Sequence, residues 1–339
     1  MTYASEKQPL VSIIIPVYNA QSYLRDTIDC ISRQTYRSYE FLFVDDGSND
    51  NTINIIEKAR ETNNKIKLFH RERLPKGAPT CRNIGLDNSQ GKYVIFIDAD
   101  DLFSDTFLEK RVMYMEKNSN CDYAIFRGSN YVMTKDNKHY IGGKTWGEAI
   151  SRDILSDFLS TNYPFSIWNN IYVKEKIKKI YWDEKISVYQ DFDYALSIIF
   201  EKLHFNFVMN QDFDYFYRRG ISNTISSDFI SDSKFHSTLY LFDKTWNSIS
   251  DIQNSEKYKN DFTNFFILQF SRIMIDGSSQ QKVSFLEFCN NKLSKGTIKK
   301  MKSVEKICSK LNNKKAVKLI IYTFYYPNML LKYVVKFNK

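Results

Sequence analysis

Four short hydrophobic runs recur in the first hundred residues, and each is followed by polar or acidic positions. The runs are residues 10–16, 39–44, 66–69 and 93–97. Such short apolar runs are typical of buried strands. The segments between them carry apolar residues at helical spacing, as in residues 23–31, 52–58 and 79–89. Strands that alternate with helices over short connections predict an α/β fold with a mostly parallel sheet flanked by helices.

The most acidic strand end is Asp98-Ala99-Asp100-Asp101, directly after the fourth run. Carboxylates this close repel one another unless a divalent cation neutralises them, and oxygen ligands suit Mg²⁺ or Mn²⁺. The alternative is an acidic turn in which Asp101 or Ser104 caps the next helix. Because ligands bind beyond the carboxyl ends of parallel strands, we expect residues 16–19, 45–46 and 98–100 at one edge of the sheet.

Four sequence blocks occur in a fixed order: VSIIIPVYNA, VDDGSNDNT, a loop with CRNIGL, and GKYVIFIDADD. Together they resemble the nucleotide-sugar-binding half of a family 2 glycosyltransferase with the GT-A (Rossmann-like) fold, over roughly residues 10–130. The resemblance implies a catalytic domain of residues 1–228, in which 9–130 bind the nucleotide sugar and 131–228 form the acceptor side and a lid. Residues 229–339 are then a mainly helical, basic C-terminal appendage.

This resemblance gives the acidic strand end a specific chemistry. It implies a nucleotide diphosphate sugar, most naturally a UDP-sugar, as donor and Mn²⁺ or Mg²⁺ as a Lewis acid on the diphosphate. Asp100 is implied as the metal ligand, with Asp98 beside it on the metal or the ribose.

The resemblance also implies a surface that binds the base. Tyr18 would stack on the base, and the backbone around Pro16 and Val17 would meet its polar edge. Asp46 would accept a hydrogen bond from the uracil imide. From the residues alone, Tyr18 is also explained as a packed aromatic, and residues 45–47 as a turn.

Two cationic positions are implied near the diphosphate. Arg82, followed by Asn83, matches the family's Arg-Asn pair in a basic loop that leads into a helix, whose N-terminus adds partial positive charge. Its alternative role is a salt bridge to an acidic strand end. Residues 215–224 resemble the family's strand and closing loop, so that Arg218 or Arg219 would meet the diphosphate.

Transfer needs a base that takes the proton from the acceptor hydroxyl. The family places it in a Glu-Asp pair at the start of a helix, and residues 188–200 match that stretch. The resemblance therefore implies Asp191 as the base, although Gln190 replaces the usual Glu and removes a like-charge neighbour that could raise the pKa of the base. Asp193 competes for this role, and Asp191 is alternatively a helix N-terminal acid.

Residues 165–172 resemble the family's segment near the acceptor pocket, although Asn170 stands where Lys is common. The flat ring of Trp168 would stack on a sugar face or fill the hydrophobic core. The sequence favours neither role.

Composition is compatible with an enzyme that has no disulfide framework. The 339 residues are 43% hydrophobic, enough for one catalytic domain of about 230 residues and an appendage. The five cysteines are odd in number and form no close pair, which favours reduced thiols. Residues 1–8 lack a signal-peptide pattern. We therefore expect a cytoplasmic protein.

The net charge of +9 comes from the C-terminal tail. Residues 292–339 contain 13 lysines and one acid, Glu305, so residues 1–291 carry a net charge of −3. The uncharged stretch 319–331 has 13 residues and includes Pro327, whereas spanning a bilayer takes roughly 20. We expect it to lie peripherally on the inner face of the cell membrane. The alternative is a helical subdomain that packs on the catalytic core. We expect no binding of nucleic acid, because no recognised motif accompanies the basic tail.

The sequence thus predicts a metal-dependent glycosyltransferase that inverts the anomeric carbon through in-line attack. Its acceptor is expected to be a glycan, lipid-linked, in surface-polysaccharide assembly. One rival, a sugar-phosphate nucleotidyltransferase, would need a Gly-rich phosphate loop that residues 16–20 do not provide. The other is a non-catalytic nucleotide-sugar-binding or scaffold subunit, which Gln190 suggests.

Overall fold

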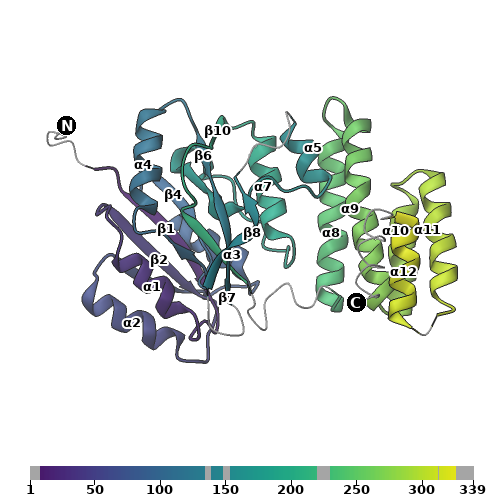
Figure 1. The fold of residues 1–339 in the computed structure, drawn as a ribbon, viewed down its shortest axis with the longest axis horizontal. Helices are drawn as coiled ribbons and strands as arrows, with labels where there is room; N and C mark the ends of the chain where they lie inside the picture. Colours follow the sequence, from purple (N-terminus) through teal and green to yellow (C-terminus); the bar gives the residue numbers. More distant parts are fainter. Residues whose placement is uncertain (1–7, 134–138, 148–152, 220–229, 312, 326–339) are drawn as a thin grey trace. The chain divides into compact units, whose positions relative to one another are not determined.

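The computed structural model describes residues 8–133, 139–147, 153–219, 230–311 and 313–325 (Figure 1). The chain divides into two compact units. The first unit comprises Met1–Ile154 and Tyr163–Thr224, and the second comprises Leu155–Asn162 and Ile225–Lys339.

A seven-stranded sheet forms the centre of the first unit, in the order β10-β6-β9-β4-β1-β2-β3. Neighbouring strands pair in parallel except β9, which is antiparallel to both β4 and β6. The predicted α/β class with a mostly parallel sheet is therefore confirmed. The strands are β1 (Val11–Val17), β2 (Tyr39–Asp45), β3 (Ile66–His70), β4 (Tyr93–Phe96), β6 (Tyr123–Phe126), β9 (Asn170–Val173) and β10 (Phe205–Val208).

Helices of the first unit connect and cover these strands (Figure 1). One close approach fixes a helix that carries site residues: α3 packs on β1 and β2, and a Cβ added to Gly85 would lie 2.4 Å from Cγ2 of Ile14. Only glycine permits this approach. The helices are α1 (Leu24–Ser32), α2 (Thr52–Thr62), α3 (Ala78–Asn88), α4 (Phe107–Lys117), α6 (Lys174–Ile177), α7 (Gln190–Phe200) and the 3₁₀ turn η1 (Ile167–Asn169).

A second sheet in this unit has the order β5-β11-β7-β8. Its strands are β5 (Leu102–Phe103), β7 (Gly128–Met133), β8 (His139–Trp146) and β11 (Tyr215–Arg219). Because β5 directly follows the acidic segment 98–101, its antiparallel pairing with β11 brings residues 215–219 alongside those carboxylates. Two segments more than a hundred residues apart in the chain, 98–101 and 215–219, therefore lie side by side.

A buried ion pair anchors the chain where β11 begins. Arg111 of α4 donates from Nε and Nη2 to both carboxylate oxygens of Asp214, at 2.9 and 2.8 Å. Its Nη1 donates to the carbonyl of Trp168 at 3.1 Å, and its guanidinium lies 3.9 Å from the ring centroid of Phe107. Both charged side chains are fully buried. The pair thus links α4, η1 and β11.

The second unit is helical, as expected for the C-terminal region. Its core is a cluster of phenylalanine rings, in which Phe242 lies 4.7 Å from Phe266 and 5.2 Å from Phe262 between ring centroids. The helices are α5 (Ile154–Leu159), α8 (Asp232–Ser250), α9 (Ser255–Asp276), α10 (Ser279–Asn290), α11 (Lys295–Cys308) and α12 (Lys314–Tyr325).

The start of the expected membrane-surface segment belongs to this helical unit. Val317 and Ile321 of α12 are buried, and the ring of Tyr325 lies 6.0 Å from Phe270 of α9. Residues 326–339 lie outside the described residues. Over the part of the chain that the structure describes, no helix combines the length and the apolarity needed to span a bilayer.

Replacing Arg111 with leucine should destabilise the first unit by about 3–5 kcal/mol, because the carboxylate of Asp214 would stay buried without its partner. Thermal and urea unfolding would measure the change. The matched control is Arg60→Leu, which removes an exposed pair with Glu57 on α2 and should cost less than about 1 kcal/mol. Equal effects of the two substitutions would contradict the role given to the buried pair.

Candidate active site

The loops that follow β1 and β2 are locked to each other. The backbone N–H of Asn19 donates to Oγ of Ser48 at 3.0 Å, and Oδ1 of Asn19 accepts from the N–H of Asn49 at 2.9 Å. Asn19 has a left-handed φ of 48°, a conformation that asparagine tolerates well. These bonds fix the residue before it, Tyr18, at the sheet edge.

The ring of Tyr18 is available to a ligand. It is 49% exposed, so it is not a packed core aromatic. The ammonium of Lys76 lies 3.7 Å from its ring centroid. Val17 is buried, and its carbonyl accepts from the N–H of Asp46 at 2.9 Å, which joins β1 to the residue after β2. Pro16 is half-buried beside them.

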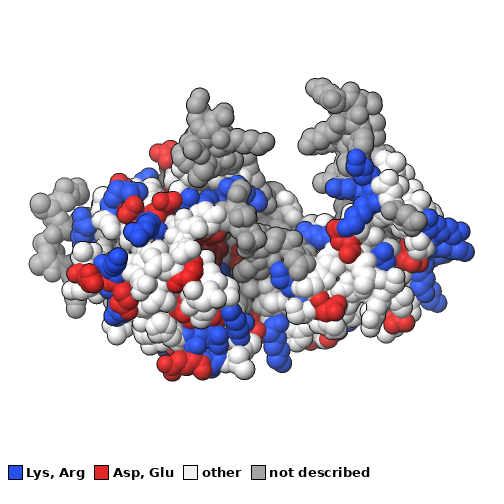
Figure 2. Space-filling view, turned by 90° about the horizontal axis from the view of Figure 1, so that it is seen from below, with Lys and Arg blue, Asp and Glu red and all other residues white. Residues whose placement is uncertain are grey.

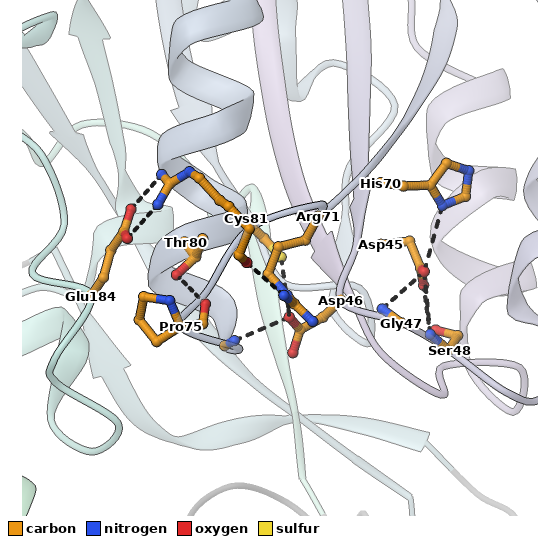
Figure 3. Close-up of polar contacts among 12 residues, drawn as sticks. Asp45, Asp46, Gly47, Ser48, His70, Arg71, Pro75, Thr80, Cys81 and Glu184 are labelled. Carbon is orange, nitrogen blue, oxygen red and sulfur yellow. Dashed lines mark hydrogen bonds and ion pairs between the residues drawn. The ribbon is translucent and has the colours of Figure 1, made fainter.

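The two aspartates after β2 have different partners (Figure 3). Asp45 forms a turn, since its carboxylate accepts from the N–H groups of Gly47 and Ser48. Asp46 is held instead through Oδ1, which accepts from Nε of Arg71 at 2.5 Å and from the N–H of Gly77 at 3.0 Å. Within the described residues no donor reaches Oδ2 of Asp46. That oxygen keeps its capacity to accept.

The acidic segment after β4 is anchored at both ends. Oδ1 of Asp98 accepts from Nη2 of Arg82 at 2.8 Å. Asp101 is fully buried and accepts from the hydroxyl of Tyr215 at 2.6 Å and from the N–H of Arg218 at 2.8 Å. The carboxylate of Asp101 therefore binds β11, and the helix-capping alternative is wrong for this residue.

Negative charge is concentrated between these anchors. Burial and the neighbouring Asp98 raise the pKa of Asp100 to about 6. Burial, Asp100 and Asp98 together raise the pKa of Asp101 well above its ordinary value, against the hydrogen bond from Tyr215. The protein partners of this segment therefore do not compensate for the burial and repulsion of its carboxylates.

Arg82 connects this segment to α7. Its guanidinium is 4% exposed, donates to Asp98, and donates from Nη1 to Oε1 of Gln190 at 3.0 Å. The indole of Trp182 lies under it, with 4.4 Å from Cζ to the ring centroid. The expected alternative, a salt bridge to an acidic strand end, is therefore present. Nε of Arg82 is buried and has no hydrogen-bond partner among the described residues.

Asn83 has a structural position. Its amide donates to the carbonyl of Trp182 at 2.9 Å and to Glu184 at 2.8 Å, and its Oδ1 accepts from the N–H of Trp182. It thereby holds segment 182–184 against α3, which places Trp182 under Arg82.

Asp191 interacts electrostatically with Arg82 and Asp98. Burial raises its pKa, Arg82 opposes that shift, and Asp98 adds to it. The hydroxyl of Ser166 donates to Oδ2 of Asp191 at 2.9 Å. The competing candidate, Asp193, is 5% exposed, consistent with its position on another face of α7.

Arg218 is bound by the protein itself. Its Nε donates to the carbonyl of Asp100 at 2.7 Å, and its Nη2 donates to Asp26 at 2.8 Å. Arg219 donates from Nε to Asn130 at 3.0 Å. Residues 220–229, most of the expected lid, lie outside the described residues.

Trp168 fills the core. Its side chain is 2% exposed and stacks on Tyr215, with ring centroids 4.5 Å apart and an interplanar angle of 9°. Stacking on a sugar face would require an exposed ring, so the core alternative holds.

Four contributors went unrecognised in the sequence: Arg71 on Asp46, Lys76 on Tyr18, Ser166 on Asp191, and Tyr215 on Asp101. Arg71 and Lys76 stand in the basic loop after β3, so the excess of charge in that loop was a usable signal. The sequence contains no comparable signal for Ser166 and Tyr215, whose partners are 25 and 114 residues away.

Among the described residues, no group of three or more His, Cys, Asp or Glu side chains is arranged to hold a metal ion unaided. Of the three aspartates after β4, Asp98 and Asp100 are half-buried, whereas Asp101 is fully buried. Two carboxylates leave coordination positions for oxygens of a bound phosphate ligand.

Comparison with known proteins identifies the family. The model of glycosyl transferase family 2 matches residues 12–181. An uncharacterized glycosyltransferase of Haemophilus influenzae is 30% identical over 234 residues, which cover 69% of this chain and 86% of that protein. The chain belongs to glycosyltransferase family 2, and it is a glycosyltransferase.

Two further relatives are similar over different lengths. A putative teichuronic acid biosynthesis glycosyltransferase, TuaG of Bacillus subtilis, is 37% identical over 112 residues, or 33% of this chain and 44% of that protein. The crystal structure of S. aureus TarS in complex with UDP-GlcNAc matches 93% of this chain and 91% of that chain, with a TM-score of 0.63 and 16% identity. This structural likeness supports the GT-A fold of the first unit, and the matched part of the chain continues into the helical second unit.

Asp100→Asn should stabilise the metal-free protein at about pH 7 and change little at about pH 4. Because the pKa of Asp100 is raised on folding from 3.8 to about 6, its stabilising contribution is complete below the unfolded pKa and is lost as the pH rises through the folded one. Asparagine mimics the neutral form, so the gain above about pH 6 should reach up to about 3 kcal/mol.

Thermal unfolding in the presence of a chelator, at both pH values, would measure this gain. The control is Asp29→Asn, at an exposed position of α1, which should show no such difference. A gain that is the same at both pH values would rule out titration of Asp100 as its source.

Proposed function

We propose that this glycosyltransferase moves a sugar from a UDP-sugar to a glycan acceptor with inversion of the anomeric carbon. One observation carries the proposal: Arg82 donates both to Asp98, on the donor side, and to Gln190, the residue before Asp191. A single buried cation thus contacts one of the proposed metal-binding acids and the residue next to the proposed base.

The donor side fits a uridine nucleotide. The exposed ring of Tyr18 offers a stacking surface, and the backbone at Pro16 and Val17 lies beside it. Oδ2 of Asp46 is oriented by the bonds that Arg71 and Gly77 make to Oδ1, and it would accept from the imide of uracil. The UDP-GlcNAc bound in TarS supports this choice of donor.

Asp98 and Asp100 would hold a divalent cation, because a positive ion would offset the burial of Asp100 and its repulsion by Asp98, which together raise the pKa of Asp100. Both would be ligands, and Mn²⁺ or Mg²⁺ would act there as a Lewis acid on the diphosphate leaving group. We assign Arg218 a supporting role, since its bonds to Asp26 and to the Asp100 carbonyl hold the acidic segment in place.

Asp191 would take the proton from the acceptor hydroxyl. A general base works best with a pKa near the working pH, and burial shifts the pKa of Asp191 upward in that direction. Ser166 orients the carboxylate through its hydrogen bond to Oδ2, which leaves Oδ1 for the acceptor. The attack would be in line with the departing diphosphate.

The relatives and the basic tail support a proposal for the acceptor class. The name of the Bacillus subtilis relative refers to teichuronic acid biosynthesis, and we propose a surface glycan as the product here, with a lipid-linked acceptor. The donor would be met in the cytoplasm, and the protein would act at the inner face of the membrane.

Asp191→Asn should lower sugar transfer by about 100-fold or more, because proton transfer by a positioned base contributes about that much. Affinity for UDP should stay unchanged. Release of UDP from a panel of UDP-sugars with Mn²⁺, together with calorimetric UDP binding, would measure both quantities.

The matched control is Asp193→Asn, two residues further along α7, which should keep transfer if the protein remains folded. Chelation of the metal should abolish transfer by the parent enzyme. Full transfer by Asp191→Asn would refute the base, and absence of turnover by the parent with every donor would favour the scaffold alternative.

Membrane attachment is tested by deleting residues 326–339, which preserves α12 and its buried residues Val317 and Ile321. The truncated protein should lose co-sedimentation with phosphatidylglycerol vesicles, since lysines near an anionic surface contribute about 1 kcal/mol each. Leu319→Ser with Phe324→Ser, at exposed positions of α12, tests the described part of this surface. Unchanged binding by both variants would exclude the tail as the anchor.

A further inference from the structure

The second unit has a cleft lined mainly by lysines. It has a volume of about 420 Å³ and lies along α11 beside the end of α10. Figure 2 shows basic side chains gathered on this unit, at the right of the view. The lining residues are Asn290, Lys295, Ile298, Lys299, Lys302, Ser303 and Lys306.

The four lysines form one stripe on α11. They are spaced by four, three and four residues, which places them on one face of the helix over about 16 Å. All four are exposed. The opposite side of α11 is the packed one, where Met301 and Val304 are fully buried.

The stripe is not neutralised by the protein. No ion pair joins any of its four lysines to an acid within the described residues, whereas Lys292 pairs with Asp243 and Lys314 pairs with Asp276 in the same unit. Four like charges along one wall repel one another, and an anion that bridges them would relieve that repulsion.

We propose that this cleft binds a linear anionic glycan, the acceptor chain or a segment of it. The choice of a glycan rests on the proposed function. The anionic groups, phosphate or carboxylate, are recognised by the ammonium groups, and a chain that carries several of them can contact the four lysines in turn.

Two other polyanions fit the cleft less well. A bilayer surface is bound through exposed apolar side chains that insert beside the lysines, but the one apolar residue of the lining, Ile298, is 5% exposed. Single-stranded nucleic acid is bound through aromatic rings that stack on bases, and the lining contains no aromatic residue. A glycan needs neither feature.

The experiment compares dextran phosphate with neutral dextran of the same length, each fluorescently labelled, by anisotropy on the full chain without donor. Dextran phosphate should bind and dextran should not. Changing all four lysines to glutamine should weaken binding by at least about tenfold and flatten its dependence on salt, because fewer counterions are released. The variant is K295Q/K299Q/K302Q/K306Q.

Two control variants separate the site from net charge and from misfolding. The first changes four exposed lysines of the first unit to glutamine and so loses the same charge; it should bind as the parent does. The second changes the four stripe lysines to arginine and should retain binding. The first control is K58Q/K117Q/K179Q/K202Q.

Equal binding of dextran phosphate by the parent and the glutamine variant would overturn the proposal. Tighter lysine-dependent binding of single-stranded DNA or of phosphatidylglycerol vesicles would overturn it as well. UDP binding by the glutamine variant is measured separately and should not change. A failure of the cleft is therefore distinguishable from a failure of the proposed transfer chemistry.

Discussion

The crowding of carboxylates at the end of β4 is the constraint on which the rest of the first unit depends. Asp98, Asp100 and Asp101 follow a buried strand. Burial and Asp98 raise the pKa of Asp100, and burial, Asp100 and Asp98 raise the pKa of Asp101. The fold responds with partners from distant segments. Arg82 comes from α3, and β11 supplies the hydroxyl of Tyr215 and the guanidinium of Arg218. The pKa values stay raised despite these partners, so neutralisation by the protein is only partial.

Partial neutralisation requires that these partners stay in place. The antiparallel pairing of β5 with β11 sets their register, and the Arg111–Asp214 pair fixes the residue before β11. A buried ion pair adds little net stability, but it is costly to break and therefore specifies one arrangement. The close approach of Gly85 to Ile14 likewise fixes the position of α3 on the sheet. The packing around the site thus serves mainly to position charge.

Sequence patterns predicted the parallel strands, the acids at their ends and the helix that begins at Gln190, because these features are local in the chain. They did not predict which groups the side chains of Arg218 and Trp168 contact. Arg218 is bound to Asp26, 192 residues away, and Trp168 stacks on Tyr215 inside the core. Neither outcome is encoded in local periodicity, since each depends on how β11 pairs. For the same reason the contact of Lys76 with Tyr18 became visible only once two loops were brought together.

Gln190 shows how one neutral side chain changes the balance of charge. A glutamate in its place would form an ion pair with Arg82, whereas glutamine only accepts a hydrogen bond from it. The positive charge of Arg82 therefore remains directed at Asp98 and at Asp191, whose pKa it lowers against the effect of burial. An added carboxylate would weaken that effect and would repel Asp191 directly. With glutamine, the pKa of Asp191 is therefore raised less than it would be beside a second carboxylate. The departure from the family's Glu-Asp pair is thus compatible with catalysis.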